Sequence, residues 1–368
     1  MLNSRMPAQE CSPESTSSLP RRASIADENG SASNALQQRG ESERSPSNGD
    51  LLDDSSRLFL AYFRYIHPIW PLLYKPLYDS LDHHEMLATM PRSLVFAIFS
   101  IAVLIHHVEF ENEPLSKHDQ AKRYFDEALS ALTGSEITPN NALAGVKPSI
   151  LHCQVYTILA LQQHSIGAFS QAGIFCAIAS SMAIDQSLYR TNTQDNHVDA
   201  QVKSRLWWTI YVLEKMLSTE MNRPVLLRAE EADTPYPSVD ESDEFELYSD
   251  GNHPGAIVEQ RTRHLLKSRT MSAFHTSIKV ARIMESVCRE IYSMAARQRI
   301  RQDRESGENT RLRLLAELQA YEAEVEKSPL KLDRSGDVQS IPVTVTNYVV
   351  CIVHVTCSIM LIFYSSCG

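Results

Sequence analysis

The sequence has few cysteines, and they are scattered along the chain. Seven occur among 368 residues, and no two have the Cys-x-x-Cys spacing that is typical of a zinc site. Structural zinc needs thiolates grouped at short spacing, and an odd cysteine count disfavours a disulfide framework. The first 50 residues also lack the apolar run of a signal peptide. We therefore expect free thiols in a reducing compartment and no cofactor in this chain. The cysteines are Cys11, Cys153, Cys176, Cys288, Cys351, Cys357 and Cys367.

The chain also lacks the short motifs of common enzyme classes. It has no Gly-x-Ser-x-Gly, no His-Glu-x-x-His, no phosphate-binding loop and no dinucleotide-binding glycine pattern. We predict that the protein is not an enzyme. The alternative, an enzyme on an all-α scaffold, requires a cleft with perturbed acids or bases. Neighbours on a helix point about 100° apart, so adjacent ligands do not converge on one ion. We therefore expect no metal at His83-His84, His106-His107 or His152-Cys153.

Positive charge is in deficit. The formal net charge is −10 and the isoelectric point is about 5.7, so non-specific binding to nucleic acid is disfavoured. One basic run stands out, at Arg297, Arg299, Arg301 and Arg304. It lacks interleaved aromatic residues, and glutamates follow it. We expect a solvated helical surface with compensated charges rather than a nucleic-acid contact. Those glutamates are Glu317, Glu322, Glu324 and Glu326.

Residues 1–50 have almost no large apolar side chains and are rich in serine, proline and asparagine. Such a segment cannot bury enough surface to offset the entropy lost on ordering, so we predict a disordered linker. Ser24 follows Arg21-Arg22-Ala23, which is a basophilic kinase pattern, and Ser45 precedes a proline. Both serines are candidate phosphorylation sites, although the simpler interpretation is a solvated linker.

The rest of the chain has helical periodicity, and we predict an all-α fold in which many antiparallel helices pack together. Ser116 is placed to cap a helix that continues to residue 132, and Pro148 suits a first helical turn. The apolar stretch 343–364 is interrupted by Asn347 and His354, which favours a helix over a membrane anchor. The expected helices cover residues 93–108, 116–132, 148–163, 170–185, 204–224, 265–296, 311–327 and 343–364.

The segment 204–224 is the most informative part of the chain. Leucine and isoleucine recur in it at helical spacing, and aromatic residues fill the flanks. A helix with so little polar surface must be buried in a large helical domain. We interpret Trp207-Trp208 as core packing rather than a ligand site. Arg205 and Arg223 are expected to cap helix ends and to pair with Glu214 or Glu220; the alternative is that they line an effector cavity.

The segment contains Arg205-Leu206-Trp207-Trp208, then Tyr211, then Glu214-Lys215, and finally Asn222-Arg223-Pro224. This pattern resembles the signature of the regulatory, or middle-homology, domain of fungal zinc-cluster transcription factors. Asn222 replaces the usual glycine before Arg-Pro, and asparagine tolerates the left-handed backbone that glycine supplies. Upstream, Gln186-Ser187 stands where the family has Leu-Gly. The residues that carry the resemblance are Arg205, Leu206, Trp207, Trp208, Tyr211, Glu214, Lys215, Arg223, Pro224, Asp233 and Pro235.

The resemblance implies a regulatory domain over residues 51–368, incomplete at its C-terminus and without the family's six-cysteine DNA-binding cluster. It further implies a nuclear regulator of fungal genes of a metabolic or secondary-metabolite pathway, transcribed by RNA polymerase II, with other transcription factors or co-regulators as partners and a small-molecule effector. Zinc would belong to the missing module, DNA contact would be indirect, and no membrane is involved. The alternative is a stand-alone co-regulator or dominant-negative partner. The acidic residues 229–250 are expected to form a surface loop rather than an activation segment.

Overall fold

The computed structural model describes residues 48–105, 116–133, 148–245 and 269–328. The chain divides into two units, Met1–Ser47 and Asn48–Gly368, and all the described residues lie in the second unit. Several predictions lie outside the described residues: the disordered linker up to residue 47, its serines Ser24 and Ser45, the pair His106-His107, and the helix 343–364. The described ranges contain ten α-helices and no strand, so the predicted all-α class is confirmed.

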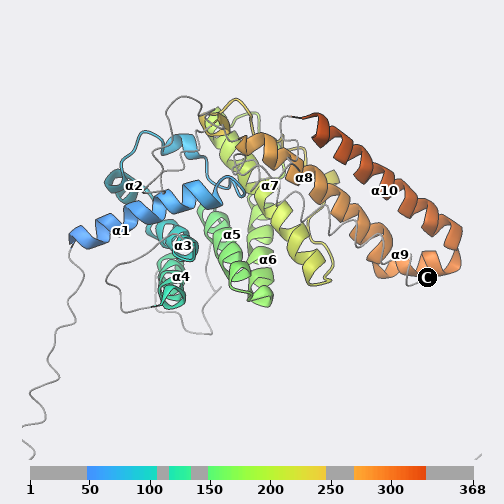
Figure 1. Cartoon of the computed structure of the whole chain (residues 1–368), viewed down its shortest axis with the longest axis horizontal. Coiled ribbons are helices and arrows are strands. Elements are labelled where there is room, and N and C mark those ends of the chain that lie inside the picture. The colour runs from blue at the N-terminus through green and yellow to red at the C-terminus, as the bar shows by residue number, and fades with distance from the viewer. Residues whose placement is uncertain (1–47, 106–115, 134–147, 246–268, 329–368) are drawn as a thin grey trace, which may run out of the picture. The chain divides into compact units, whose positions relative to one another are not determined.

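Short turns of π- or 3-10 helix connect several of the α-helices (Figure 1). The turns used below are η4 (Ser242–Phe245) and the π-helical turn η5 (Cys288–Tyr292). The α-helices are α1 (Asn48–Ala61), α2 (His83–Thr89), α3 (Arg92–Ala102), α4 (Lys117–Thr133), α5 (Ile150–Ser165), α6 (Phe169–Asp185), α7 (His197–Glu220), α8 (Thr270–Val287), α9 (Met294–Gln302) and α10 (Arg304–Lys327).

Helices α5, α6 and α7 pack side by side and form the centre of the domain (Figure 1). The hairpin between α5 and α6 turns at Gly167, whose φ of +79° is a conformation that glycine adopts at little cost. The predicted start of α5 was wrong by two residues. Pro148 lies outside the helix because the hydroxyl of Ser149 takes the cap and accepts a hydrogen bond from the His152 amide.

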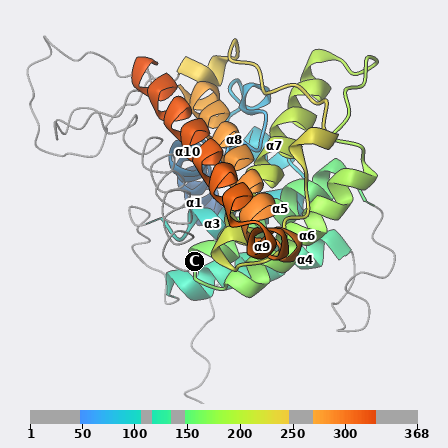
Figure 2. The ribbon, with the colours of Figure 1, turned by 90° about the vertical axis from the view of Figure 1, so that its right-hand side faces the viewer.

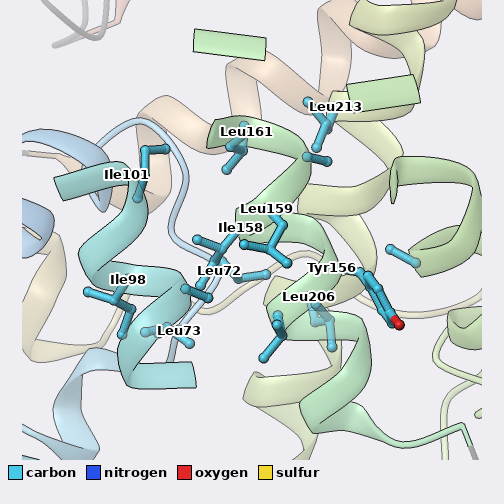
Figure 3. Packing of buried hydrophobic residues seen from close by; sticks show 14 of the residues in the cluster. Leu72, Leu73, Ile98, Ile101, Tyr156, Ile158, Leu159, Leu161, Leu206 and Leu213 are labelled. Atoms are coloured by element: carbon cyan, nitrogen blue, oxygen red, sulfur yellow. The ribbon is translucent and has the colours of Figure 1, made fainter. Parts of the chain in front are cut away.

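A large apolar core lies between these helices and the elements around them. Figure 3 shows part of it, with Ile98 and Ile101 from α3, Ile158 and Leu159 from α5, and Leu206 from α7. Trp207 and Trp208 are each only 3% exposed, as expected for a helix that is apolar almost all round. A second buried cluster joins α8 to η5 and α10, and includes Val280, Met284, Ile291, Leu314, Leu318 and Val325.

The predicted single helix 265–296 is interrupted in the structure. Helix α8 ends at Val287, η5 follows, and Ser293 adopts an extended backbone with ψ of 150°. The hydroxyl of Ser293 then accepts a hydrogen bond from the Ala296 amide and caps a new helix, α9. The sequence pattern did not indicate this break, because serine occurs both at helix N-caps and inside helices.

The C-terminal helix α10 starts seven residues earlier than predicted. It begins at Arg304 because Asp303 accepts a hydrogen bond from the Ser306 amide at 3.0 Å. The prediction of compensated charges on the basic run is also wrong for α9. Within the described residues, no carboxylate pairs with Arg297, Arg299 or Arg301, whereas Glu317 pairs with Arg313 and Glu324 with Lys279.

The remaining predictions concern two helices of the N-terminal half and membrane spans. The Ser116 cap is confirmed, since its hydroxyl accepts a hydrogen bond from the Asp119 amide at 3.2 Å. Helix α3 ends at Ala102 rather than near residue 108, and Val103–Ile105 form a turn. In the parts of the chain that the structure covers, no helix has the length and apolar character to cross a membrane.

Candidate functional site

The candidate site is α7 together with the segment that follows it. Helix α7 is capped by the side chain of Asn196 and ends at Glu220. Asn222 has a φ of +51°, so the predicted left-handed turn is confirmed. The amide of Arg223 donates back to the Ser218 carbonyl at 2.8 Å, which closes the helix end. The chain then folds back over α7, and we call residues 223–245 the strap.

The strap is attached first through a buried ion pair on α7. Glu214 and Lys215 are adjacent, almost fully buried, and bonded to each other. The Glu214 carboxylate also accepts a hydrogen bond from the Leu226 amide at 2.9 Å, and the Lys215 ammonium donates to the Leu227 carbonyl at 2.5 Å. The pair therefore satisfies one backbone donor and one backbone acceptor of the strap. Ser218 adds a bond to Glu214 at 2.7 Å.

The second attachment is the carbonyl of Pro235. It accepts hydrogen bonds from Trp208 Nε1 at 3.0 Å and from the Ser204 hydroxyl at 2.6 Å. The ring of Tyr236 packs edge-on against Trp208, with the ring centroids 4.9 Å apart. By contrast, Nε1 of Trp207 is buried and has no hydrogen-bond partner among the residues that the structure describes. The two adjacent tryptophans thus differ, because only Trp208 bonds to the strap.

Asp233 attaches the strap to the loop after α6. Its carboxylate accepts a hydrogen bond from the Thr191 amide at 2.6 Å, and its carbonyl accepts one from the Thr191 hydroxyl at 2.8 Å. Thr234 donates to the carbonyl of Leu188 at 2.6 Å. In this loop Ser187, at the position where the resembled family has glycine, has a φ of +53°. A serine held in this conformation stores backbone strain.

The final attachment is a buried charge cluster around Asp243. Two guanidinium nitrogens of Arg205 donate to its carboxylate, at 2.5 and 3.0 Å, and His67 Nε2 donates to it at 3.0 Å. Arg205 also donates to the Leu73 carbonyl at 3.2 Å, and its guanidinium lies 4.8 Å from the centroid of the Tyr74 ring. Both Arg205 and Asp243 are 0% exposed. The cluster joins three segments that are far apart in the sequence.

The electrostatics of this cluster follow from its geometry. Burial by itself raises the pKa of the Asp243 carboxyl, but the hydrogen bonds from His67 and Arg205 outweigh it and hold that pKa well below its usual range. Burial also raises the pKa of Tyr74 to about 12, and its hydrogen bond to Glu241 at 2.7 Å adds to this effect. Asp243 is therefore ionised at neutral pH and depends on Arg205 for compensation.

Helix α8 contacts both the strap and α7. The Glu285 carboxylate accepts from the Tyr211 hydroxyl at 2.7 Å and from the Ala229 amide at 3.1 Å. Glu244 accepts hydrogen bonds from the Met271 and Ser272 amides at 2.7 and 3.0 Å, so a strap residue caps α8. The polar groups of the strap are thus shared between the helices on either side of it.

Two of the predicted roles need correction. Arg205 lies inside α7 rather than at its end, and it pairs with Asp243 because the strap brings that carboxylate back over the helix. Neither expected carboxylate pairs with an arginine: Glu214 bonds to Lys215, and Glu220 to His164. Arg223 is exposed and lies against Gly173, where the methyl group of an alanine would sit 2.7 Å from its guanidinium.

The structure also bears on a cavity, a metal and an activation segment. Two surface hollows lie on α4 and at the start of α10, and neither is lined by Arg205 or Arg223. No group of three metal-ligating side chains occurs in the described ranges. Burial raises the pKa of the Cys153 thiol to about 12, which disfavours the thiolate that metals require. The acidic segment 229–250 was predicted to form a surface loop. Asp243 and Glu244 are buried, so this part of the segment is not a free surface loop.

The sequence indicates the helix but not its partners. His67, Asp243 and Glu285 were not predicted as site residues. Asp243 lies 38 positions from Arg205 and 176 from His67, and Glu285 lies 74 positions from Tyr211, to which it bonds. The available signal was the position of three charged residues within the apolar stretch of the helix. Arg205, Glu214 and Lys215 all had to find partners because a buried charge without one is costly.

Comparison with known proteins places the chain in a family. Residues 60–323 match the fungal specific transcription factor domain. An uncharacterized transcriptional regulatory protein of Schizosaccharomyces pombe is 22% identical over 188 residues, which are 50% of this chain and 22% of that protein. The matched part thus spans about a fifth of the relative. No solved structure matches the chain. Because the family match covers well over half of its residues, the chain belongs to the family of the fungal specific transcription factor domain.

Proposed function

We propose that this chain regulates transcription in the nucleus of a fungus, and that residues 51–368 act as its regulatory domain. The observation that carries the proposal is the use of the charged residues of α7. Arg205, Glu214 and Lys215 are buried, and each bonds to the strap. Because these charged side chains are buried and bonded to the strap, they hold a conformation and are not free to contact a substrate. This supports a regulatory role over an enzymatic one.

In the proposed mechanism the strap is a two-state element. When it is docked, Pro235, Leu227 and Asp243 bond to α7, and Glu244 caps α8. An effector that prefers the released strap shifts the population only by its difference in affinity for the two states. A tenfold preference is equivalent to about 1.4 kcal/mol. That amount is comparable to one hydrogen bond of the strap, so a small molecule or a partner protein suffices.

DNA contact in this proposal is indirect. The chain carries a net charge of −10, which disfavours holding DNA by its own field. DNA would be reached through a zinc cluster elsewhere or through partner transcription factors and co-regulators. The relative in Schizosaccharomyces pombe, which is described as a transcriptional regulatory protein, supports the assignment to transcription.

The two tryptophans of α7 provide a matched test. Trp208→Phe removes the hydrogen bond to Pro235, whereas Trp207→Phe makes the same chemical change at a nitrogen that has no partner among the described residues. The full chain is fused to a heterologous DNA-binding domain and an activation segment, and a reporter gene is measured in yeast. We expect W208F to raise reporter output several-fold over W207F and wild type at equal protein abundance, because a docked strap restrains activation.

One result contradicts the proposal, and another calls for a substitute variant. Equal reporter output from W208F, W207F and wild type would contradict it, if limited proteolysis shows that the strap of W208F is cleaved faster. A fall in protein abundance for both tryptophan variants points to folding alone. In that case Ser204→Ala, which deletes the second donor to Pro235 with little loss of volume, replaces W208F in the same comparison.

A further inference from the structure

Helix α9 is a short basic element at one end of the domain. It joins the ends of α8 and α10 and packs on η5 and α10 (Figure 2). Ala296 is fully buried on its inner side, while Met294, Arg297, Arg299 and Arg301 are exposed. At 100° per residue, Met294, Arg297 and Arg301 lie within about 60° of one another on the outward face, whereas Arg299 lies about 140° from Met294 and nearer the side of Ala296.

The arginines of α9 differ from those around them. Arg289 pairs with Glu230 and Glu285, Arg311 with Glu308, and Arg313 with Glu290 and Glu317. Arg297, Arg299 and Arg301 have no carboxylate partner in the part of the chain that the structure describes. Helix α9 also contains no acidic residue. The result is a patch of uncompensated positive charge on a chain that is acidic overall.

The same patch has an apolar component. Met294 is 79% exposed, the highest value for a large apolar side chain among the described residues. The guanidinium of Arg297 lies 5.7 Å from the centroid of the Tyr292 ring, which holds the charge beside an aromatic surface. Methionine is flexible and polarizable, and such side chains adapt to apolar groups of varied shape. The patch therefore offers both cations and an adaptable apolar contact.

We propose that this face of α9 is a docking surface for an acidic peptide that carries apolar side chains. Charge complementarity selects an anionic partner, because the guanidinium groups present forked donors to carboxylates. The phosphates of duplex DNA supply the negative charge, but the DNA backbone has no apolar side chain that could pack against Met294. The overall negative charge of the chain also opposes a long polyanion. The acidic peptide is therefore the better match.

The test uses the purified full chain and three fluorescent probes: a ten-residue peptide of alternating glutamate and leucine, a peptide of alternating glutamate and serine, and a 20-base-pair DNA duplex. Fluorescence polarisation measures binding at low and moderate salt. The glutamate–leucine peptide should bind most tightly and should weaken as salt rises, because the Debye length falls below about 10 Å above 0.1 M. Arg297→Glu with Arg301→Glu should weaken it at least about tenfold, and Met294→Gln several-fold.

The control reverses two charges elsewhere. Lys122→Glu with Arg123→Glu changes the net charge equally on the surface of α4, and should leave peptide affinity within about twofold. Circular dichroism melts verify that each variant is folded. Equal affinities for the two charge-reversed variants contradict the proposal, because they assign binding to net charge alone. Tighter binding of the DNA duplex than of the glutamate–leucine peptide also contradicts it and identifies the patch as a phosphate contact.

Discussion

Replacement of Asp243 by asparagine is the sharpest test of the packing argument. The two side chains have nearly the same shape, so the change removes charge without creating a cavity. Arg205 donates two hydrogen bonds to the carboxylate at 2.5 and 3.0 Å, and the amide can accept only one of them. Its NH2 group then faces a donor, and the buried guanidinium has no counter-charge.

The magnitude follows from this geometry. Breaking a buried ion pair by removing one partner costs about 3–5 kcal/mol. That is a large part of the roughly 5–15 kcal/mol that stabilises an ordinary domain. At roughly 2–4 °C for each kcal/mol, the melting temperature should fall clearly. An exposed pair provides the control: Lys279 and Glu324 are 41% and 61% exposed, so E324Q should cost at most about 1 kcal/mol.

Urea unfolding followed by tryptophan fluorescence measures both variants. The pH dependence adds a second readout. Folding lowers the pKa of Asp243, so its contribution is fully present above the pKa of an unfolded carboxyl, about 3.9, and is lost as pH falls through the folded value. The part of the difference between wild type and D243N that comes from the carboxylate should therefore shrink below about pH 4. If D243N costs no more than E324Q at pH 7, the buried-pair reasoning is refuted.

Three further predictions concern other parts of the domain. Trp208→Ala should destabilise the domain by about 3–5 kcal/mol in a thermal or urea melt, because it opens a cavity and removes the donor to Pro235. If this variant unfolds at the same temperature or urea concentration as the wild type, the burial of α7 is contradicted. Ser187→Gly should raise stability by about 0.5–1 kcal/mol by relieving a φ of +53°, whereas Ser181→Gly inside α6 should lower it. Cys153 should resist alkylation at pH 8 until urea unfolds the protein, since burial raises the pKa of its thiol to about 12; mass spectrometry of labelled peptides measures this.

The features predicted well from sequence were local. The apolar periodicity of residues 204–224, the cap at Ser116 and the left-handed Asn222 each depend on a few neighbouring residues. The break at Ser293 was missed because serine at a break and serine within a helix give the same pattern. The partner of Arg205 was missed for a different reason. A buried arginine indicates that a carboxylate is needed, but only the path of the strap selects Asp243.

Part of the attachment of the strap is made by its main chain. The carbonyls of Leu227, Pro235 and Pro237 accept from Lys215, Trp208 and His275, and the amides of Leu226 and Ala229 donate to glutamates. Every residue type supplies a backbone carbonyl, so the effects of single substitutions on stability should differ between the strap and α7. Most single exchanges at exposed strap positions such as Leu226 and Val239 should be silent, and exchanges at the α7 residues that hold them should not. The exposed positions of this segment can therefore diverge and acquire new recognition properties without disturbing its attachment.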